Sequence, residues 1–142
     1  MNHSEIKSLL TNCTYLEDQS VTIAGVKFYG TPYQPVFHDW AFNRTDDERK
    51  VLFAKIPSDA DVVMCHGPPF EILDKCYSGV RAGCQIMRAE ILNRVKPKLM
   101  VFGHIHESYG SVQIDGTTFI NASSCNLRYK AVNKPQVFDI PI

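Results

Sequence analysis

The sequence predicts an α/β protein with a mixed sheet. In the middle of the chain, segments with helical periodicity alternate with short apolar strands, and a run of strands follows toward the C-terminus. The 142 residues are 44% hydrophobic and 21% charged, values typical of a globular protein. No internal repeat, low-complexity tract or linker-like stretch divides the chain. A single domain over residues 1–142 is therefore expected.

The first third of the chain is predicted to contain short elements separated by turns. A helical turn is expected near Ser4 to Leu10, and Ala24-Gly25 is typical of a hairpin turn. Residues 30–42 are aromatic and include two prolines, which lack a backbone donor, so they predict an irregular packed loop. The expected β-rich pieces are Thr14–Leu16, Val21–Ile23 and Val26–Tyr29.

The aromatic loop itself is interpreted as structural. Trp40 with Phe37 and Phe42 is typical of a loop-pinning core rather than of a stacking platform. His38, next to Asp39, is interpreted as a surface or packing residue.

Two helices are predicted in the middle of the chain. Thr45 followed by three acidic residues opens a helix that ends before Pro57, because a capping side chain and negative charge suit the amino end of a helix. A second helix is predicted from about Gly83 to Val95, where apolar residues recur at helical spacing and should cover one face of the sheet. The predicted buried stripe consists of Met87, Ile91 and Val95.

The later strands follow from apolar runs bounded by turn residues. Asp115-Gly116 is a hairpin signal between two of them. The expected strands are Asp61–His66, Leu99–Gly103, Tyr109–Ile114, Thr117–Asn121 and Gln136–Ile140.

Charge and cysteine content exclude several classes of protein. The 15 basic and 15 acidic side chains balance, so no sustained basic patch is expected to bind a nucleic-acid polymer or a membrane surface. No segment approaches the ~20 apolar residues of a membrane helix, and the first residues lack the apolar run of a signal peptide. The five irregularly spaced cysteines indicate reduced thiols in the cytoplasm, with Cys65 and Cys84 packed as small apolar groups.

Three histidines follow the ends of two predicted strands. His66 begins a Gly-Pro-Pro turn, and His104 and His106 follow the strand that ends at Gly103. Because residues i and i+2 of extended backbone face the same side, the last two imidazoles are expected to point together, with Ile105 directed into the packing. Ligand sites of α/β folds assemble at strand carboxyl ends, and imidazole is the commonest neutral metal ligand. The histidines are therefore candidate metal ligands; the alternative is a hydrogen-bonded structural role for each.

Two glycines flank these histidines and are candidate supporting residues. Gly67 follows the first histidine, and Gly103 is expected to let the backbone turn closely beside the others, without a Cβ. Cys65 beside His66 resembles a thiol–imidazole pair. Adjacent strand residues face opposite sides, however, so a nucleophilic dyad is not expected.

These motifs together resemble a known family. The chain is similar to the calcineurin-like metallophosphoesterases, and in particular to their metallophosphoesterase-domain-containing (fetal brain protein 239-like) branch. The G-H-x-H motif is moderately specific alone and strongly so with H-G-P-P upstream, and the resemblance covers nearly the whole chain. It implies the C-terminal half of an α/β/β/α sandwich with mixed sheets. The motifs are Cys65-His66-Gly67-Pro68-Pro69, Gly103-His104-Ile105-His106 and Asn121-Ala122-Ser123.

The resemblance also implies an activity. Such enzymes hydrolyse phosphate esters and phosphodiesters, nucleotides among them, with two divalent ions (Mn, Fe or Zn) that activate a bridging hydroxide. Carried over to this chain, His66 and His104 would share one ion, and His106 would bind its neighbour.

The chain departs from the family by lacking three earlier motifs. D-x-H, G-D and G-N-H do not occur as metal-site motifs in these residues, so no catalytic residue is identified and the chain alone is expected to be inactive. The alternative function is a truncated, non-catalytic metal-binding or regulatory fragment that pairs with other chains. With part of the sandwich absent, an exposed apolar edge or face and self-association through it are expected.

Overall fold

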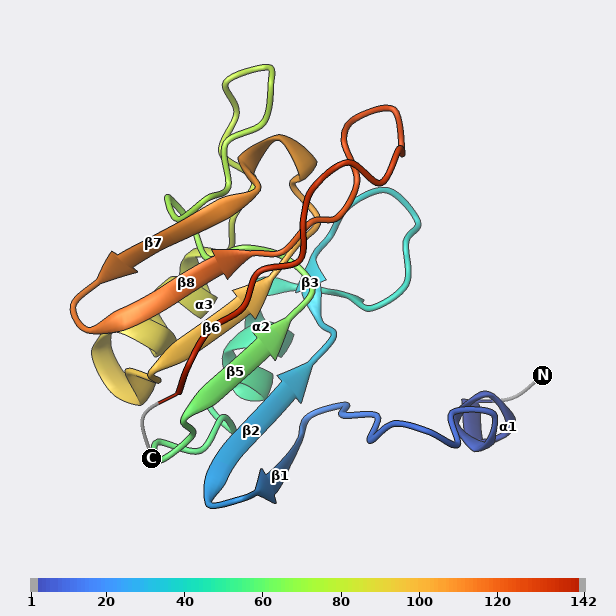
Figure 1. Cartoon of the computed structure of the whole chain (residues 1–142), viewed down its shortest axis with the longest axis vertical. Coiled ribbons are helices and arrows are strands. Elements are labelled where there is room, and N and C mark those ends of the chain that lie inside the picture. Colours follow the sequence, from blue (N-terminus) through green and yellow to red (C-terminus); the bar gives the residue numbers. More distant parts are fainter. Residues whose placement is uncertain (1–2, 141–142) are drawn as a thin grey trace.

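The computed structural model describes residues 3–140 and contains one six-stranded mixed sheet (Figure 1). Four strands run parallel, and an antiparallel strand lies at each edge of the sheet. With the strands numbered in chain order, their order across the sheet is β1-β2-β5-β6-β8-β7. The predicted α/β class with a mixed sheet is confirmed. The parallel strands are β2 (Val26–Thr31), β5 (Val62–Cys65), β6 (Leu99–Phe102) and β8 (Thr117–Asn121), and the edge strands are β1 (Gln19–Ile23) and β7 (Gly110–Ile114).

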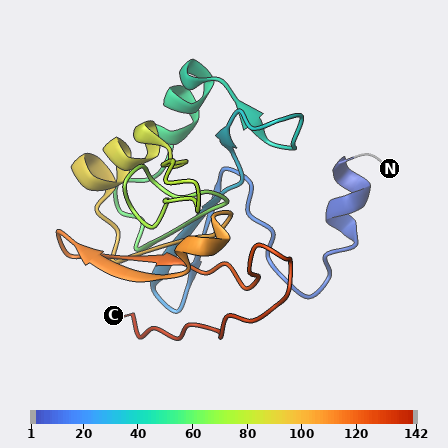
Figure 2. The ribbon, with the colours of Figure 1, turned by 90° about the horizontal axis from the view of Figure 1, so that it is seen from above.

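Two longer helical segments cover one face of this sheet, whereas α1 (His3–Ser8) stands apart from it (Figure 2). They are α2 (Asp46–Phe53) and α3 (Gln85–Glu90), and the latter continues into the π-helical turn η1 (Ile91–Val95). The core between helices and sheet includes the predicted stripe, since its three side chains are at most 5% exposed. The predicted helix from about Gly83 to Val95 is therefore confirmed, with Cys84 as its cap.

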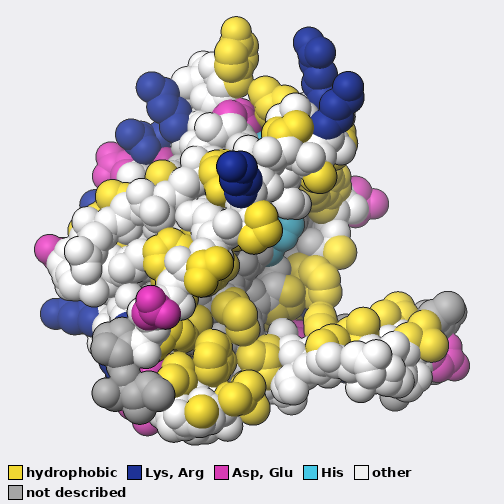
Figure 3. Space-filling model, in the orientation of Figure 1, with side chains coloured by type: hydrophobic (Ala, Val, Ile, Leu, Met, Phe, Trp, Pro, Cys, Tyr) yellow, Lys and Arg dark blue, Asp and Glu magenta, His cyan; other side chains and the backbone are white. Residues whose placement is uncertain are grey.

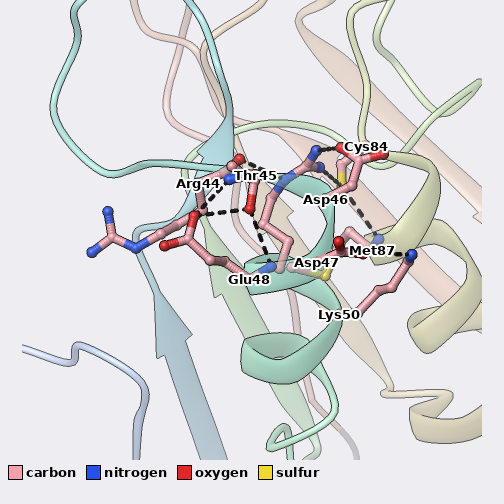
Figure 4. Close-up of polar contacts among 9 residues, drawn as sticks. Arg44, Thr45, Asp46, Asp47, Glu48, Lys50, Cys84 and Met87 are labelled. Atoms are coloured by element: carbon pink, nitrogen blue, oxygen red, sulfur yellow. Dashed lines mark hydrogen bonds and ion pairs between the residues drawn. The ribbon is translucent and has the colours of Figure 1, made fainter.

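Helix α2 begins at the predicted cap, Thr45, and the structure adds that this cap is reciprocal with Glu48 (Figure 4). The Glu48 backbone N–H donates to Thr45 Oγ1 over 3.3 Å, and the Thr45 N–H donates to the Glu48 carboxylate over 2.8 Å. Both bonds satisfy amide groups that the helix itself leaves without partners. The Thr45 N–H and the Thr45 hydroxyl both donate to the Glu48 carboxylate, and these two bonds lower the pKa of Glu48.

A buried arginine ties α2 to the start of α3. Arg49 is 6% exposed, pairs with Asp46 on its own helix, and donates to Cys84 Sγ over 2.6 Å. That sulfur also accepts the Met87 N–H at 3.4 Å and so caps α3. Cys84 is buried as expected, but it acts as a hydrogen-bond acceptor for a buried cation rather than only as a small apolar group.

The second face of the sheet is covered by irregular chain. Leu16 lies against Gly30, and Ile140 packs on a cluster formed by alternate strand residues. The predicted strands Thr14–Leu16 and Gln136–Ile140 are wrong: neither segment forms a strand, and Leu16 and Ile140 instead pack against the sheet. The buried residues of this second cluster are Val26, Val62, Leu99 and Ile120.

Hydrophobic side chains gather on the surface of this second face (Figure 3). Val137 is 88% exposed and Ile23 is 55% exposed, so the covering is incomplete. Within residues 3–140, none of the helices has the length and apolar character needed to cross a membrane.

The aromatic loop is bracketed by a short parallel ladder between β3 (Gln34–Pro35) and β4 (Asn43–Arg44). Between these strands the backbone is irregular, as predicted, but the predicted loop over residues 30–42 begins too early, because residues 30–31 belong to β2 and residues 34–35 form β3. The Asn43 side-chain amide donates to the carbonyls of Phe37 and His38 at 3.2 and 3.0 Å. This amide therefore fixes the shape of the loop from inside.

Replacing Gly83 by alanine should destabilise the protein by about 2–3 kcal/mol, because the new Cβ would overlap backbone atoms that cannot swing away. It would lie 2.4 Å from Pro69 O and 2.6 Å from Phe70 N. Gly103→Ala is the matched control, since its Cβ would meet nothing closer than Ser123 Oγ at 3.4 Å, and its effect should stay below about 1 kcal/mol. Urea denaturation of both variants tests this; equal midpoints would contradict it.

Candidate functional site

The carboxyl ends of the central strands open into a cavity of about 860 Å³. That volume lies within the range of small-molecule sites, which commonly form at strand ends of α/β sheets. The strand ends, the aromatic loop and the segment after β8 all line the cavity. All three sequence-predicted histidines are among its lining residues: His66, His104 and His106.

Two of these histidines are in direct contact. His66 Nε2 lies 3.0 Å from His104 Nδ1, so one ring nitrogen donates a hydrogen bond to the other. The strands that carry them are joined at the same level, because the Gly103 N–H donates to the His66 carbonyl over 2.9 Å. The pairing of parallel strands thus brings together two imidazoles that are 38 positions apart.

The third histidine has a different environment. His106 begins the short 3-10 helix η2 (His106–Ser108), and its Nδ1 lies 3.0 Å from the Asn126 carbonyl oxygen. Its ring also contacts Tyr129 edge-on, with 5.6 Å between centroids. The structure therefore pairs His66 with His104 and holds His106 separately in the same cavity.

The extended backbone from which the His104 and His106 imidazoles were expected to point together is not present, although Ile105 is buried as expected, at 6% exposure. Strand β6 ends at Phe102, and His104 adopts a left-handed backbone with φ of +68°. Strand alternation thus does not extend through His106. The direction of each ring is set by the turn rather than by extended backbone.

The predicted roles of the two glycines also need correction. Gly103 is absent from the residues with positive φ, and an added Cβ there would meet only an ordinary contact with Ser123 Oγ. An added Cβ at Gly67 would meet nothing within 4 Å. The sharp turn is therefore made by His104. Neither glycine position is so crowded that a side chain would not fit.

Partial burial favours the neutral form of the paired imidazoles. Loss of hydration lowers the pKa of His66. The pKa of His104 is lowered by the same loss and further by the charges of His66 and His106. Both rings therefore keep a lone pair available over a wider range of pH than a free histidine does.

Cys65 does not act with its neighbour His66. The Cys65 thiol donates to the Gly67 carbonyl over 3.0 Å, and burial raises its pKa. A protonated thiol is a weak nucleophile, so the expected absence of a dyad agrees with the geometry. All five cysteines of the chain are free thiols in the structure.

Two aromatic residues of the site were not recognised from the sequence. Phe37 and Trp40 approach the His104 ring edge-on, with 5.5 and 5.8 Å between centroids. They are 42% and 48% exposed, so the interpretation of these two rings as a loop-pinning core is wrong. His38, in contrast, packs on Phe37 with 4.3 Å between ring centroids, as a packing residue would.

The described residues fit part of a metal site. Within residues 3–140, no group of three or more His, Cys, Asp or Glu side chains is arranged to hold a metal ion. The facing nitrogens of His66 and His104 are nevertheless close enough to contact one ion together. Two nitrogens that could contact one ion are thus close together, and within the described residues no third candidate ligand joins them.

The chain is similar to several curated proteins over nearly its whole length. Metallophosphoesterase domain-containing protein 1 of Homo sapiens and of Mus musculus is 43% identical over 144 residues, covering 99% of this chain and 44% of each relative. A UPF0046 protein of Caenorhabditis elegans is 41% identical over 96% of this chain and 35% of that protein. No family model matches the chain.

A solved crystal structure superposes with a TM-score of 0.64 at 15% identity, over 84% of this chain and 49% of the other, which shows the fold alone. The chain spans less than half the length of the curated relatives. Over the span that it shares with them, the chain is therefore similar to proteins named for a metallophosphoesterase domain.

Proposed function

We propose that this chain supplies the imidazole part of a divalent-metal site for phosphate-ester hydrolysis. The observation that carries the proposal is the His66–His104 pair at the meeting ends of β5 and β6, inside a cavity of small-molecule size. The similarity to proteins named for a metallophosphoesterase domain supports the same class of reaction.

In this proposal His66 and His104 hold one ion of Mn, Fe or Zn. His106 is oriented toward a second ion by the Asn126 carbonyl, which fixes the imidazole through Nδ1. A bound divalent ion would lower the pKa of water and polarise a phosphoryl oxygen. Neutral imidazoles suit this task because they leave the charge of the ion undiminished. The carboxylate ligands would come from outside the described residues.

The proposed substrate is a small phosphate ester or phosphodiester, a class that includes nucleotides. The cavity is large enough for such a molecule, and the exposed rings of Phe37 and Trp40 give it an apolar wall beside His104.

A second candidate function is a non-catalytic fragment that binds metal or pairs with other chains. One observation favours it: the part of the chain that the structure describes brings only two metal-ligating side chains together. The exposed apolar side chains over the second sheet face would then serve self-association.

The wild-type chain should bind Zn²⁺ weakly and Mn²⁺ more weakly, because nitrogen ligands favour Zn²⁺. His104→Asn should lower the Zn²⁺ affinity at least tenfold in calorimetry by removing one of the two paired nitrogens. Asparagine tolerates the positive φ of this position, so the backbone is retained.

His38→Asn is the matched control for that variant. It makes the same substitution at another positive φ, of +47°, in a histidine outside the pair. It should leave Zn²⁺ affinity unchanged. Equal losses in the two variants, or unchanged binding in both, would contradict the assignment of His104 as a ligand.

The purified chain alone should have negligible activity on an aryl phosphodiester with Mn²⁺ present. Two paired imidazoles cannot fix two ions without a bridging carboxylate. Release of nitrophenol measures this directly. Turnover that His104→Ala abolishes would show that the described residues suffice for catalysis, contrary to the proposal.

In the presence of EDTA, the metal-free chain should lose stability as the pH falls below about 6.5, the ordinary value for histidine. The folded-state pKa of His66 and of His104 is lowered, so the unfolded chain takes up protons first and acid favours unfolding. Urea midpoints at pH 8 and pH 5.5 measure the loss. His66→Gln should reduce it, and an unchanged pH dependence in that variant would contradict the attribution.

A further inference from the structure

Asn121, the last residue of β8, is fully buried beside the histidine turn, with 0% exposure. Its side chain uses every polar atom. Nδ2 donates to the carbonyls of Ile105 at 2.8 Å and Leu73 at 3.1 Å, while Oδ1 accepts the Ser123 N–H at 3.1 Å. One amide therefore joins three segments of chain that are far apart in sequence.

The bond from Asn121 to the Ile105 carbonyl fixes the backbone between the two histidines of the turn. Ile105 lies between His104 and His106, and the adjoining His104 has its φ at +68°. A non-glycine residue keeps this conformation only when its surroundings determine it. The Ile105 N–H donates to the carbonyl of Gly103, two residues earlier, at 2.8 Å. This amide group is therefore not part of the hydrogen bonding between the strands of the sheet.

The side chain at this position has to supply two donors and one acceptor. An aspartate of the same shape keeps the acceptor for Ser123 but places oxygen against two carbonyls. A serine is too short to span them. Either change removes the shorter of two hydrogen bonds to the Ile105 carbonyl and leaves it only the Ser108 N–H at 3.2 Å, which loosens the turn that carries the imidazoles.

We propose that Asn121 is a positioning residue for the metal site, holding the His104–His106 turn through the Ile105 carbonyl so that His104 faces His66. The inference rests on the proposed function for its consequence in metal affinity, but the geometry it concerns exists without metal. Partners that orient metal ligands typically change affinity by 10–100-fold when they are removed.

The test compares Asn121→Asp and Asn121→Ser with Thr117→Val. Thr117 lies at the other end of β8, is 2% exposed, and donates to the Pro97 carbonyl at 2.7 Å. Its loss removes one buried hydrogen bond of the same strand without touching the histidine turn. All variants should have lower urea midpoints, so stability alone does not separate them.

Two readouts separate positioning from a purely structural role. Long-range ¹H–¹⁵N spectra of the imidazoles, recorded without metal, should lose the His66–His104 hydrogen-bond signature in both Asn121 variants and keep it in Thr117→Val. Zn²⁺ affinity should fall at least tenfold only in the Asn121 variants. Imidazole spectra and Zn²⁺ affinities that match those of Thr117→Val would overturn the proposal.

A measurement on the wild-type chain covers the case in which both Asn121 variants fail to fold. The Asn121 side-chain amide protons should exchange slowly with solvent, and fast exchange would overturn the inference. If the wild-type chain binds no Zn²⁺, the proposed function fails, whereas the metal-free imidazole spectra still decide the role of Asn121.

Discussion

The parallel pairing of β5 with β6 is the constraint on which the site depends. In its register Met64 lies opposite Val101, and two residues further the Gly103 N–H reaches the His66 carbonyl. A slip by one residue would turn every side chain of β6 to the other face and bury the wrong set. The apolar rows on both faces of the sheet therefore fix the register, and the register brings His66 to His104.

Buried polar side chains then hold the loops around this edge. Asp74 is fully buried and accepts bonds from the backbone of Glu71 and Gly83 and from the Arg81 guanidinium. Asn121 and Arg49 serve other segments in the same way. Because an unpaired buried polar group is costly, these bonds make the loop conformations specific rather than merely compact.

The sequence predicts those parts of the structure that follow local rules. The cap at Thr45, the stripe on the second helix and the apolar strands of the central sheet each carry a periodic or chemical signal, and these are present. The segment Gln136–Ile140 is a short run with three apolar residues, but such a run cannot distinguish pairing at a strand edge from packing over a face. The φ of His104 has no local signal, because the turn is imposed by tertiary bonds. For the same reason the approach of Phe37 and Trp40 to His104 could be learned only from the structure.

X-ray absorption spectroscopy of the Zn²⁺-loaded chain tests the central claim most directly, namely that His66 and His104 bind one ion together. The account predicts two imidazole nitrogens at about 2.0–2.1 Å from zinc, with the remaining positions filled by light atoms. The chain also carries five free thiols that compete for the same ion. Sulfur at about 2.3 Å without an imidazole contribution would contradict the account.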